Sequence, residues 1–249
     1  MVGSLQYLQL STRPDLVYTV GKLARFVSNP SKAHIDAALD VLSYLNSHCD
    51  YRIVFTSDKE SNDIQPEAYI DVDWAGDKSD RKSMAGYIFM LASSTFSWLS
   101  KKESTVNTST MEAEYIALFL STQQAAWMWQ FYEKIGFPLK EPITVHTDSQ
   151  AAISVAKGEF PHKRSKHLDI KLHAVRECIQ NSQIEVCYVP TKSNPADIFT
   201  KSLPKSLFSD HLDGLGIKST DDNEPGASSS IPAGYGKVQK TKKREEVLE

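Results

Sequence analysis

Apolar residues recur at helical spacing in the first part of the chain, residues 1–61. Successive apolar positions lie three or four residues apart, so their side chains share one face of a helix. Two amphipathic helices are therefore predicted, one starting after Pro14 and one after Pro30. Their apolar stripes are Leu16, Val20, Leu23, Ala24 and Val27 in the first helix, and Ile35, Ala38, Leu39, Leu42 and Leu45 in the second. A β-rich run at 51–55 predicts a short strand after them.

Strand and helix patterns alternate from about residue 65 to residue 217. Three closely spaced β-rich segments predict an antiparallel meander, and helical patterns separate two later ones. Ser109 and Glu112 form a capping box that predicts the start of a long helix. The predicted strands are 67–76, 86–91, 95–100, 142–147 and 183–189. The predicted helices are the long one that follows this capping box, with its apolar run at 115–132, and those at 148–157, 162–181 and 193–203. This order predicts an α/β fold in which a mixed five-stranded sheet is flanked by helices and preceded by a small helical segment.

The last residues, 218–249, differ in composition from the rest of the chain. They are rich in Gly, Pro and Ser and end in the charged run KKREEVLE. A segment of this kind cannot bury enough apolar surface to fold, so a disordered tail is predicted. The chain is thus expected to divide into residues 1–61, 65–217 and 218–249.

Charge and cysteine content narrow the class of protein. The 249 residues carry 28 basic and 31 acidic side chains, a formal net charge of −3, which excludes a globally basic nucleic-acid binder but leaves a local basic face open. No apolar run is long enough to span a membrane, and no secretion signal opens the sequence. The three cysteines are widely spaced and form no C-x-x-C pair. A non-secreted protein of a reducing compartment is therefore expected.

Four acidic residues fall where this topology brings side chains together. Asp71 lies within the first strand of the meander, Glu114 near the start of the long helix, Asp148 at the end of the fourth strand and Asp197 at the start of the last helix. In α/β folds, ligands gather at strand ends and helix starts. Four carboxylates in one place repel one another unless cations join them, and such oxygen ligands select Mg²⁺ or Mn²⁺. The chemistry that fits is phosphodiester hydrolysis with two ions ~4 Å apart.

Each of these acids also has a simpler interpretation. Asp148 can serve as a helix N-cap, and Asp197 can interact with the dipole of a first helical turn. Glu114 can be a solvated helix residue. Asp71 is less easily explained in this way, because Asp is depleted in strands. The hypothesis of a metal site therefore depends on the combination of the four residues.

Six sequence blocks resemble, in order, the motifs of the ribonuclease H domain of copia-type retrotransposon polyproteins. The blocks are YIDVDWAGDKSDRKSMAGYIF, WLSKKE, STMEAEYIAL, HTDSQAAI, RSKHLDIKLHAVRE and NPADIFTKSL. The segment before them resembles the carboxy-terminal thumb or connection part of a reverse transcriptase. The resemblance covers roughly residues 2–204. It implies a ribonuclease H-like fold for 65–217, a reverse transcriptase remnant for 1–61, and cleavage of the RNA strand of RNA–DNA hybrids during reverse transcription.

The resemblance also assigns site residues. The four metal-binding carboxylates of the family fall on Asp71, Glu114, Asp148 and Asp197, which implies two Mg²⁺ or Mn²⁺ ions as cofactors. Two positions keep a competitor: Asp73 points to the same strand face as Asp71, and Glu112 lies two residues before Glu114. The family pattern favours Asp71 and the Ala-Glu-aromatic unit favours Glu114. The loop 189–194 lacks the histidine that many cellular relatives carry before the last Asp.

Candidate substrate contacts are basic and hydroxyl side chains, since phosphate contacts supply most of the affinity for nucleic acid. Lys163, Lys166 and His167 open a basic helix, and Ser109 and Thr110 precede Glu114. The basic residues can equally form a solvated helix face, and the hydroxyls can be caps. Zinc binding by the histidines of this helix is disfavoured by their spacing. The four tryptophans, Trp74, Trp98, Trp127 and Trp129, are interpreted as core residues rather than as stacking platforms.

The expected partners are an RNA–DNA hybrid and the rest of the reverse transcriptase, with no membrane and no small-molecule cofactor. The implied location is the cytoplasm, within a virus-like particle, or the nucleus. A second hypothesis remains open: a catalytically silent remnant that only binds nucleic acid or a partner chain.

Overall fold

The structure is a computed structural model that describes residues 1–56, 65–158 and 166–220. The predicted disordered tail lies almost entirely outside these residues, as does Lys163. Within the described part of the chain, no helix is long and apolar enough to cross a membrane.

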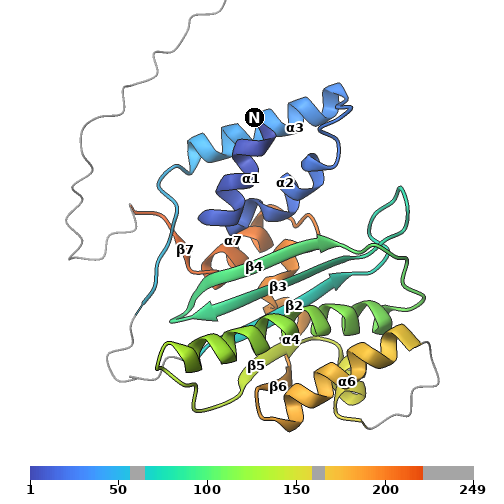
Figure 1. Cartoon of the computed structure of the whole chain (residues 1–249). Helices are drawn as coiled ribbons and strands as arrows, with labels where there is room; N and C mark the ends of the chain where they lie inside the picture. Colours follow the sequence, from blue (N-terminus) through green and yellow to red (C-terminus); the bar gives the residue numbers. More distant parts are fainter. Residues whose placement is uncertain (57–64, 159–165, 221–249) are drawn as a thin grey trace, which may run out of the picture.

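A five-stranded mixed sheet forms the centre of the fold (Figure 1). Its strand order is β4-β3-β2-β5-β6, with antiparallel pairing among β2, β3 and β4 and parallel pairing of β2 with β5 and of β5 with β6. The predicted meander and α/β fold class are therefore confirmed. The strands are β2 (Glu67–Asp73), β3 (Met84–Leu91), β4 (Ser94–Lys102), β5 (Ile143–Thr147) and β6 (Ile184–Tyr188).

Three helices cover one face of the sheet: α4 (Thr110–Lys134), α5 (Gln150–Ala156) and α6 (Lys166–Gln180). In Figure 1, α4 and α6 lie side by side below the strands. The buried core here joins Ile70 and Val145 of the sheet to Tyr115 and Leu118 of α4. Ser109 caps α4, as predicted, by accepting a hydrogen bond from the backbone N–H of Glu112 at 3.2 Å.

The opposite face carries short elements from the end of the chain. These are η2 (Thr191–Ser193), η3 (Pro195–Phe199) and α7 (Lys205–Gly214). The predicted helix 193–203 is thus a 3-10 helix, and α7 is an additional element. A further two-stranded sheet pairs β1 (Arg52–Ile53) with β7 (Ile217–Lys218). The sequence pattern did not predict α7 and β7, because their apolar residues are few and closely spaced.

The first part of the chain forms α1 (Val2–Ser11), η1 (Pro14–Leu16), α2 (Val17–Ala24) and α3 (Lys32–Ser47), which lie over α7 in Figure 1. Helix α1 was not predicted. Both predicted apolar stripes are partly wrong. Helix α2 ends before Val27. Helix α3 buries Ala38 and Val41 but leaves three of the predicted apolar positions exposed. The reason is that α3 packs on one side only, so the exposed residues are Ile35, Leu39 and Leu42.

These helices share a core with the sheet. Val17 belongs to the same buried cluster as Ile88 of β3, Phe199 of η3 and Leu215 after α7. Gln9 of α1 also accepts a hydrogen bond, through its backbone carbonyl, from Nε1 of Trp98 in β4 at 2.8 Å. The helical segment is therefore packed on the sheet through both apolar and polar contacts.

The interpretation of all four tryptophans as core residues is wrong for two of them. Trp74 is 44% exposed at the end of β2, and Trp127 is 56% exposed on α4, where its ring stacks on Phe131. Trp98 and Trp129 are half-buried. An aromatic pair at i and i+4 on a helix can cover itself on the outer face, and periodicity alone does not distinguish that arrangement from core packing.

Candidate active site

Four acidic residues come from four different elements at one edge of the sheet. Asp71 lies in β2 and Asp148 directly follows β5, its parallel neighbour. The last paired residues of these strands are Tyr69 and His146, and Asp71 and Asp148 each lie two positions further on. Adjacent parallel strands therefore carry both acids to the same edge. Glu114 reaches this region from α4, and Asp197 from η3, and both elements pack on β2.

Asp71 is deeply buried, with 3% of its surface exposed. The hydroxyl of Thr200 donates a hydrogen bond to its Oδ2, and the Lys201 ammonium lies 3.8 Å from the same oxygen. Burial raises the pKa of Asp71 well above its usual range, and the negative charge of Asp197 raises it further, while Lys201 and Thr200 partly oppose this rise. Asp71 thus requires a cation to be fully ionised at neutral pH.

Asp197 is brought to Asp71 by the way η3 is anchored. Asn194 caps η3 by accepting a hydrogen bond from the N–H of Ala196 at 3.1 Å. The same amide side chain donates to the carbonyl of Ile70, the neighbour of Asp71, at 2.8 Å. A single buried side chain therefore fixes η3 against β2. Asp197 itself is 4% exposed, and its Oδ1 lies 2.9 Å from the ammonium of Lys201.

Gly86 explains how closely η3 can approach the sheet. It stands directly opposite Asp71 in the antiparallel register of β2 and β3. A Cβ atom at this position would lie 2.8 Å from Cβ of Phe199 and 2.9 Å from Cγ2 of Thr200. Such contacts are shorter than side chains tolerate, so glycine is required here for steric reasons. The close packing also fixes Thr200 beside Asp71.

Glu114, like Asp71, lies in a strongly perturbed environment. Burial raises its pKa to about 8, with further contributions from the charges of Asp71, Asp148 and Asp197 against an opposing one from Lys201. All three other acids therefore lie within electrostatic range of Glu114. Its Oε2 atom is buried and has no hydrogen-bond partner. A buried carboxylate oxygen without a partner is costly, and a cation or a donor from a ligand would relieve this cost.

Asp148 is half-buried, whereas Asp71 and Asp197 are almost completely buried. Its Oδ2 accepts a hydrogen bond from the hydroxyl of Thr191 at 2.7 Å, which ties the end of β5 to η2. The interpretation of Asp148 as an N-cap is wrong, because Ser149 caps α5 by accepting from the N–H of Ala152 at 3.2 Å. The carboxylate of Asp148 therefore keeps one oxygen free of local capping.

The two competing acids have other surroundings. Asp73 packs against the backbone of Gly76, where a Cβ atom would lie 1.7 Å from Asp73 Oδ2. Burial raises its pKa, and Lys201 and Lys22 lower it. Glu112 accepts hydrogen bonds from the N–H and hydroxyl of Thr108 at 2.8 and 2.7 Å. Its carboxylate thus completes the start of α4, although it reaches Thr108 rather than the N-cap Ser109.

The chemistry of the donor set can be compared with that of a cation site. All candidate ligands are carboxylate oxygens, which suit a hard divalent cation such as Mg²⁺ or Mn²⁺. A bound cation would also give the unpartnered oxygen of Glu114 a partner and reduce the repulsion between Asp71 and Asp197. Among the residues that the structure describes, however, no three acidic, His or Cys side chains are already close enough together to hold an ion. Lys201 is the cation that contacts both Asp71 and Asp197.

The candidate substrate-binding residues are described only in part. Ser109 is half-buried as the cap of α4, and Thr110 is the exposed first residue of that helix. Lys166 and His167 begin α6, and nothing of their side chains is described. Lys163 lies outside the described residues. The structure thus places Ser109 and Thr110 two turns or less before Glu114, and the other three stay predictions.

Four residues at the site were missed by the sequence analysis, namely Gly86, Asn194, Thr200 and Lys201. A usable signal existed for three of them, because Asn194, Thr200 and Lys201 lie in the same sequence block as Asp197. Lys201 also stands four residues after Asp197, the spacing of an ion pair on a helical turn. Gly86 gave no local signal, since its role depends on η3 packing across the sheet.

A buried histidine, His211 of α7, also lies near the site. Burial lowers the pKa of His211, and the negative charge of Asp197 partly opposes this lowering.

The strand order β4-β3-β2-β5-β6, with helices on both faces, defines a ribonuclease H-like fold. No protein-family profile matches the chain. Curated relatives do: it is 38% identical over 207 residues to the retrovirus-related Pol polyprotein from transposon TNT 1-94 of Nicotiana tabacum, covering 83% of this chain and 15% of the relative. It is 34% identical over 217 residues to the Pol polyprotein from transposon RE1 of Arabidopsis thaliana, covering 87% and 14%. Over most of its length the chain is therefore similar to copia-type Pol polyproteins of plant transposons, and it spans about one seventh of their length.

A shorter curated relative and two solved structures are also similar. The secreted RxLR effector protein 161 of Plasmopara viticola is 43% identical over 127 residues, which cover 51% of this chain and 87% of that protein. The RNase H1 of Halobacterium salinarum NRC-1 has a TM-score of 0.41 and 19% identity, covering 55% of this chain and 94% of that one. LC11-RNase H1 in complex with an RNA/DNA hybrid has a TM-score of 0.43 and 16% identity, with the same coverage.

Proposed function

We propose that this chain is a divalent-metal-dependent ribonuclease that hydrolyses the RNA strand of RNA–DNA hybrids. The observation that carries the proposal is that four acids, in β2, in α4, directly after β5 and in η3, lie at one edge of the sheet, with the pKa values of Asp71 and Glu114 raised by burial and by their neighbours. Acids buried together are costly unless a cation joins them. The similarity to the Pol polyproteins supports the proposal, because a ribonuclease H step is implied by the sequence blocks that carry these acids.

In this proposal two Mg²⁺ or Mn²⁺ ions are held by Asp71, Glu114, Asp148 and Asp197. When bound, the ions would make an attacking water acidic and stabilise the leaving oxygen of the phosphodiester. The protein contributes no side-chain nucleophile. Its carboxylates must be ionised to bind, so loading of the site releases the protons that Asp71 and Glu114 hold at neutral pH.

The residues around the acids have positioning roles. Thr200 orients Asp71 through its hydroxyl, and Thr191 holds one oxygen of Asp148 at 2.7 Å. Asn194 ties η3 to β2 by its hydrogen bond to the Ile70 carbonyl. A catalytic group that is misplaced by about 1 Å loses much of its effect, so these fixed contacts matter for rate. The site is therefore built mainly on rigid elements rather than on free loops.

The hybrid would contact the protein next to these acids. Ser109 and Thr110 at the start of α4 offer hydroxyl and backbone donors, and Lys163, Lys166 and His167 are proposed to bind phosphates. The rest of the reverse transcriptase is the proposed protein partner, and the proposed location is the cytoplasm, within a virus-like particle, or the nucleus. With two divalent cations bound, the local charge near the hybrid would become more positive.

The direct test is cleavage of a labelled RNA–DNA hybrid by the purified chain in Mg²⁺ or Mn²⁺. We expect cleavage of the RNA strand that stops in EDTA, with duplex DNA and single-stranded RNA left intact. Hybrid binding without turnover in either metal would favour the alternative of a catalytically silent remnant. Asp148→Asn is the first variant to compare, because Asp148, unlike Asp71 and Asp197, is only half-buried and its loss is not expected to disturb the core.

A further inference from the structure

Lys201 occupies an unusual position between two acids of different elements. Its Nζ lies 2.9 Å from Oδ1 of Asp197 in η3 and 3.8 Å from Oδ2 of Asp71 in β2. Both carboxylates are almost completely buried, whereas the lysine side chain is 35% exposed. The stem of Lys201 therefore reaches in from the surface and carries its charge to the two buried acids.

In the metal-free protein, the positive charge of Lys201 stabilises the arrangement of the two acids. Two carboxylates in a poorly solvated place repel each other, and one ammonium between them reduces that repulsion. The repulsion would otherwise act against the packing of η3 on β2, which is the contact that brings Asp197 to the site. The ammonium therefore lies between the two carboxylates, where a bound divalent cation would also act.

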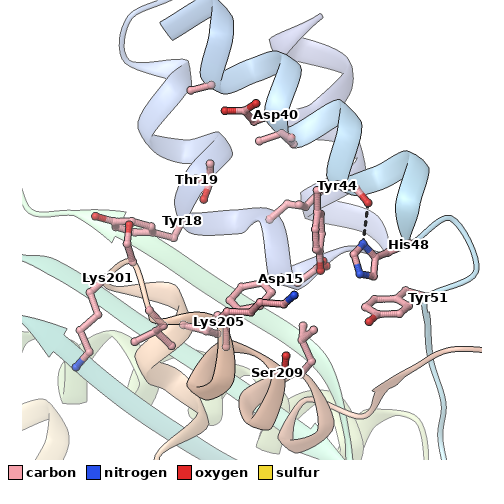
Figure 2. Close-up of a pocket in the computed structure, with 18 residues that line it drawn as sticks. Asp15, Tyr18, Thr19, Asp40, Tyr44, His48, Tyr51, Lys201, Lys205 and Ser209 are labelled. Atoms are coloured by element: carbon pink, nitrogen blue, oxygen red, sulfur yellow. Dashed lines mark hydrogen bonds between the residues drawn. The ribbon is translucent and has the colours of Figure 1, made fainter. Parts of the chain in front are cut away.

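The surroundings of Lys201 leave it room to move. It contributes to the wall of a cavity of about 580 Å³ between η3, α7 and the helices of the first part of the chain. Figure 2 shows the lysine at one end of this cavity, with its ammonium directed away from Asp15 and Tyr44. Tyr18 and Leu203 line the cavity nearby. Because one side of the stem faces open space, the ammonium can leave the acids without repacking of the core.

We propose that Lys201 is a built-in counter-cation that joins Asp71 and Asp197 in the metal-free protein and is displaced when a divalent cation binds. The inference rests on the proposed function, since it takes the acids as metal ligands. Lys201 then has two opposite effects: it stabilises the metal-free fold, and it weakens metal binding because its ion pairs must first be broken. A lysine that assisted the metal or contacted substrate alone would not give this opposite pair of effects.

The test compares three full-length variants with the unmodified chain. Lys201→Met removes the charge and keeps a long stem, and Lys201→Arg keeps the charge. Lys205→Met is the matched control, because Lys205 lines the same cavity from the start of α7. For each protein, the melting temperature is measured in EDTA and in saturating Mg²⁺, and Mg²⁺ affinity is measured by titration calorimetry without nucleic acid.

We expect Lys201→Met to melt about 2–4 °C lower in EDTA and to bind Mg²⁺ at least about threefold more tightly. Its gain in melting temperature on adding Mg²⁺ should exceed that of the unmodified chain. Lys201→Arg and Lys205→Met should stay close to the unmodified chain in EDTA, and Lys205→Met should also match it in Mg²⁺ affinity. If Lys201→Met folds only when Mg²⁺ is present, the inference is supported in its strongest form.

Several results would overturn the inference. These are unchanged or weaker Mg²⁺ binding by Lys201→Met, failure of that variant to fold even in Mg²⁺, and absence of Mg²⁺ binding in every protein tested. The readouts do not require cleavage. Tighter Mg²⁺ binding by Lys201→Met in a chain that cleaves no hybrid would therefore support the role of Lys201 while contradicting the proposed function.

Discussion

The oxygen atom Oε2 of Glu114 is buried without a hydrogen-bond partner, and three other acids act on the same carboxyl group. Asp71, 3% exposed, is in a similar position beside Asp197. Both groups have raised pKa values in the folded protein, so the folded state holds protons that the unfolded chain releases at neutral pH. Their contribution to stability is complete below the unfolded pKa of about 4 and is lost as the pH rises through the folded values. For Glu114 the window ends at about pH 8.

The metal-free protein is therefore expected to lose stability between about pH 4 and pH 8. Asp71→Asn removes one of the repelling charges, so in EDTA at pH 8 it should be more stable than the unmodified chain by on the order of 1–2 kcal/mol. Near pH 4 the two proteins should be nearly equal. Thermal melts across this range in EDTA measure the difference, with Asp36→Asn on the exposed face of α3 as the control. Equal pH profiles for Asp71→Asn and the unmodified chain would contradict the electrostatic description.

The four candidate acids follow from the sequence, whereas most of the residues that contact them become apparent only in the structure. Asp71 stands out because Asp is depleted in strands, whereas Asp148 and Asp197 also fit ordinary roles at helix starts and were selected by the combination of the four acids and by the family resemblance. The choice of Asp71 over Asp73 came from the family pattern, since both side chains point to one strand face, and it stays a prediction. Thr200 and Lys201 become recognisable as partners of Asp71 only when η3 is seen on β2.

At the scale of elements, the contact between η3 and the strands decides whether the site exists. Gly86 permits this contact because it presents no Cβ atom to Phe199 and Thr200. Gly86→Ala should push η3 away by a few tenths of an ångström or more, which would separate Asp197 from Asp71. We expect a loss of about 1–3 kcal/mol in unfolding free energy, as for other overpacked sites.

The Gly86→Ala variant should also lose Mg²⁺ affinity, since two of the proposed ligands move apart. Chemical unfolding and Mg²⁺ titration measure the two effects. A suitable control is Gly21→Ala in α2, where a Cβ atom would meet nothing within 4 Å. If Gly86→Ala were as stable and bound Mg²⁺ as tightly as Gly21→Ala, the close packing of η3 would not be what assembles the site.

The elements themselves were predicted unevenly, for physical reasons. Strands and the long helix α4 have strong periodicity and a cap at Ser109, so their positions follow from local sequence. The short pieces η3, α7 and β7 depend on packing against the sheet, and their own periodicity is weak. The sequence of helix α3 predicts a continuous apolar stripe, but the helix packs on one side only. Leu39 is therefore among its exposed residues.

At the scale of the whole molecule, the first helices and the ribonuclease H-like part share one buried cluster. Val17 of α2, 4% exposed, packs with Ile88 and Phe199, and β1 pairs with β7. A polar link adds to this: the guanidinium of Arg25, directly after α2, lies 2.7 Å from the carboxylate of Asp77, which also accepts from Lys102 at 2.6 Å. The hydrogen bond from Lys102, together with those from the hydroxyl and N–H of Ser79, holds the pKa of Asp77 well below its usual range. The sequence divides the chain at residues 61–65, but the packing joins the two parts.

The two parts are therefore expected to unfold in one cooperative transition. Val17→Ala should lower the melting temperature of the sheet as well as of the helices, because it opens a cavity in the shared cluster at a cost of about 1–3 kcal/mol. Calorimetry combined with circular dichroism in the near and far ultraviolet would detect this. Two separate transitions, with the sheet unaffected by Val17→Ala, would show instead that the helices are an independent unit.

The central claim is that four particular carboxylates hold the metal that cleaves RNA, and the chain offers close controls for two of them. Asp71→Asn and Glu114→Gln can be compared with Asp73→Asn and Glu112→Gln, which change an acid two residues away in the same element. The measurement is the rate of RNA cleavage in a labelled RNA–DNA hybrid at saturating Mg²⁺, with hybrid affinity determined in parallel. We expect Asp71→Asn and Glu114→Gln to lose at least about 100-fold in rate while hybrid binding persists. Asp73→Asn and Glu112→Gln should stay within several-fold of the unmodified chain. Cleavage by Asp71→Asn or Glu114→Gln at the unmodified rate would contradict the account.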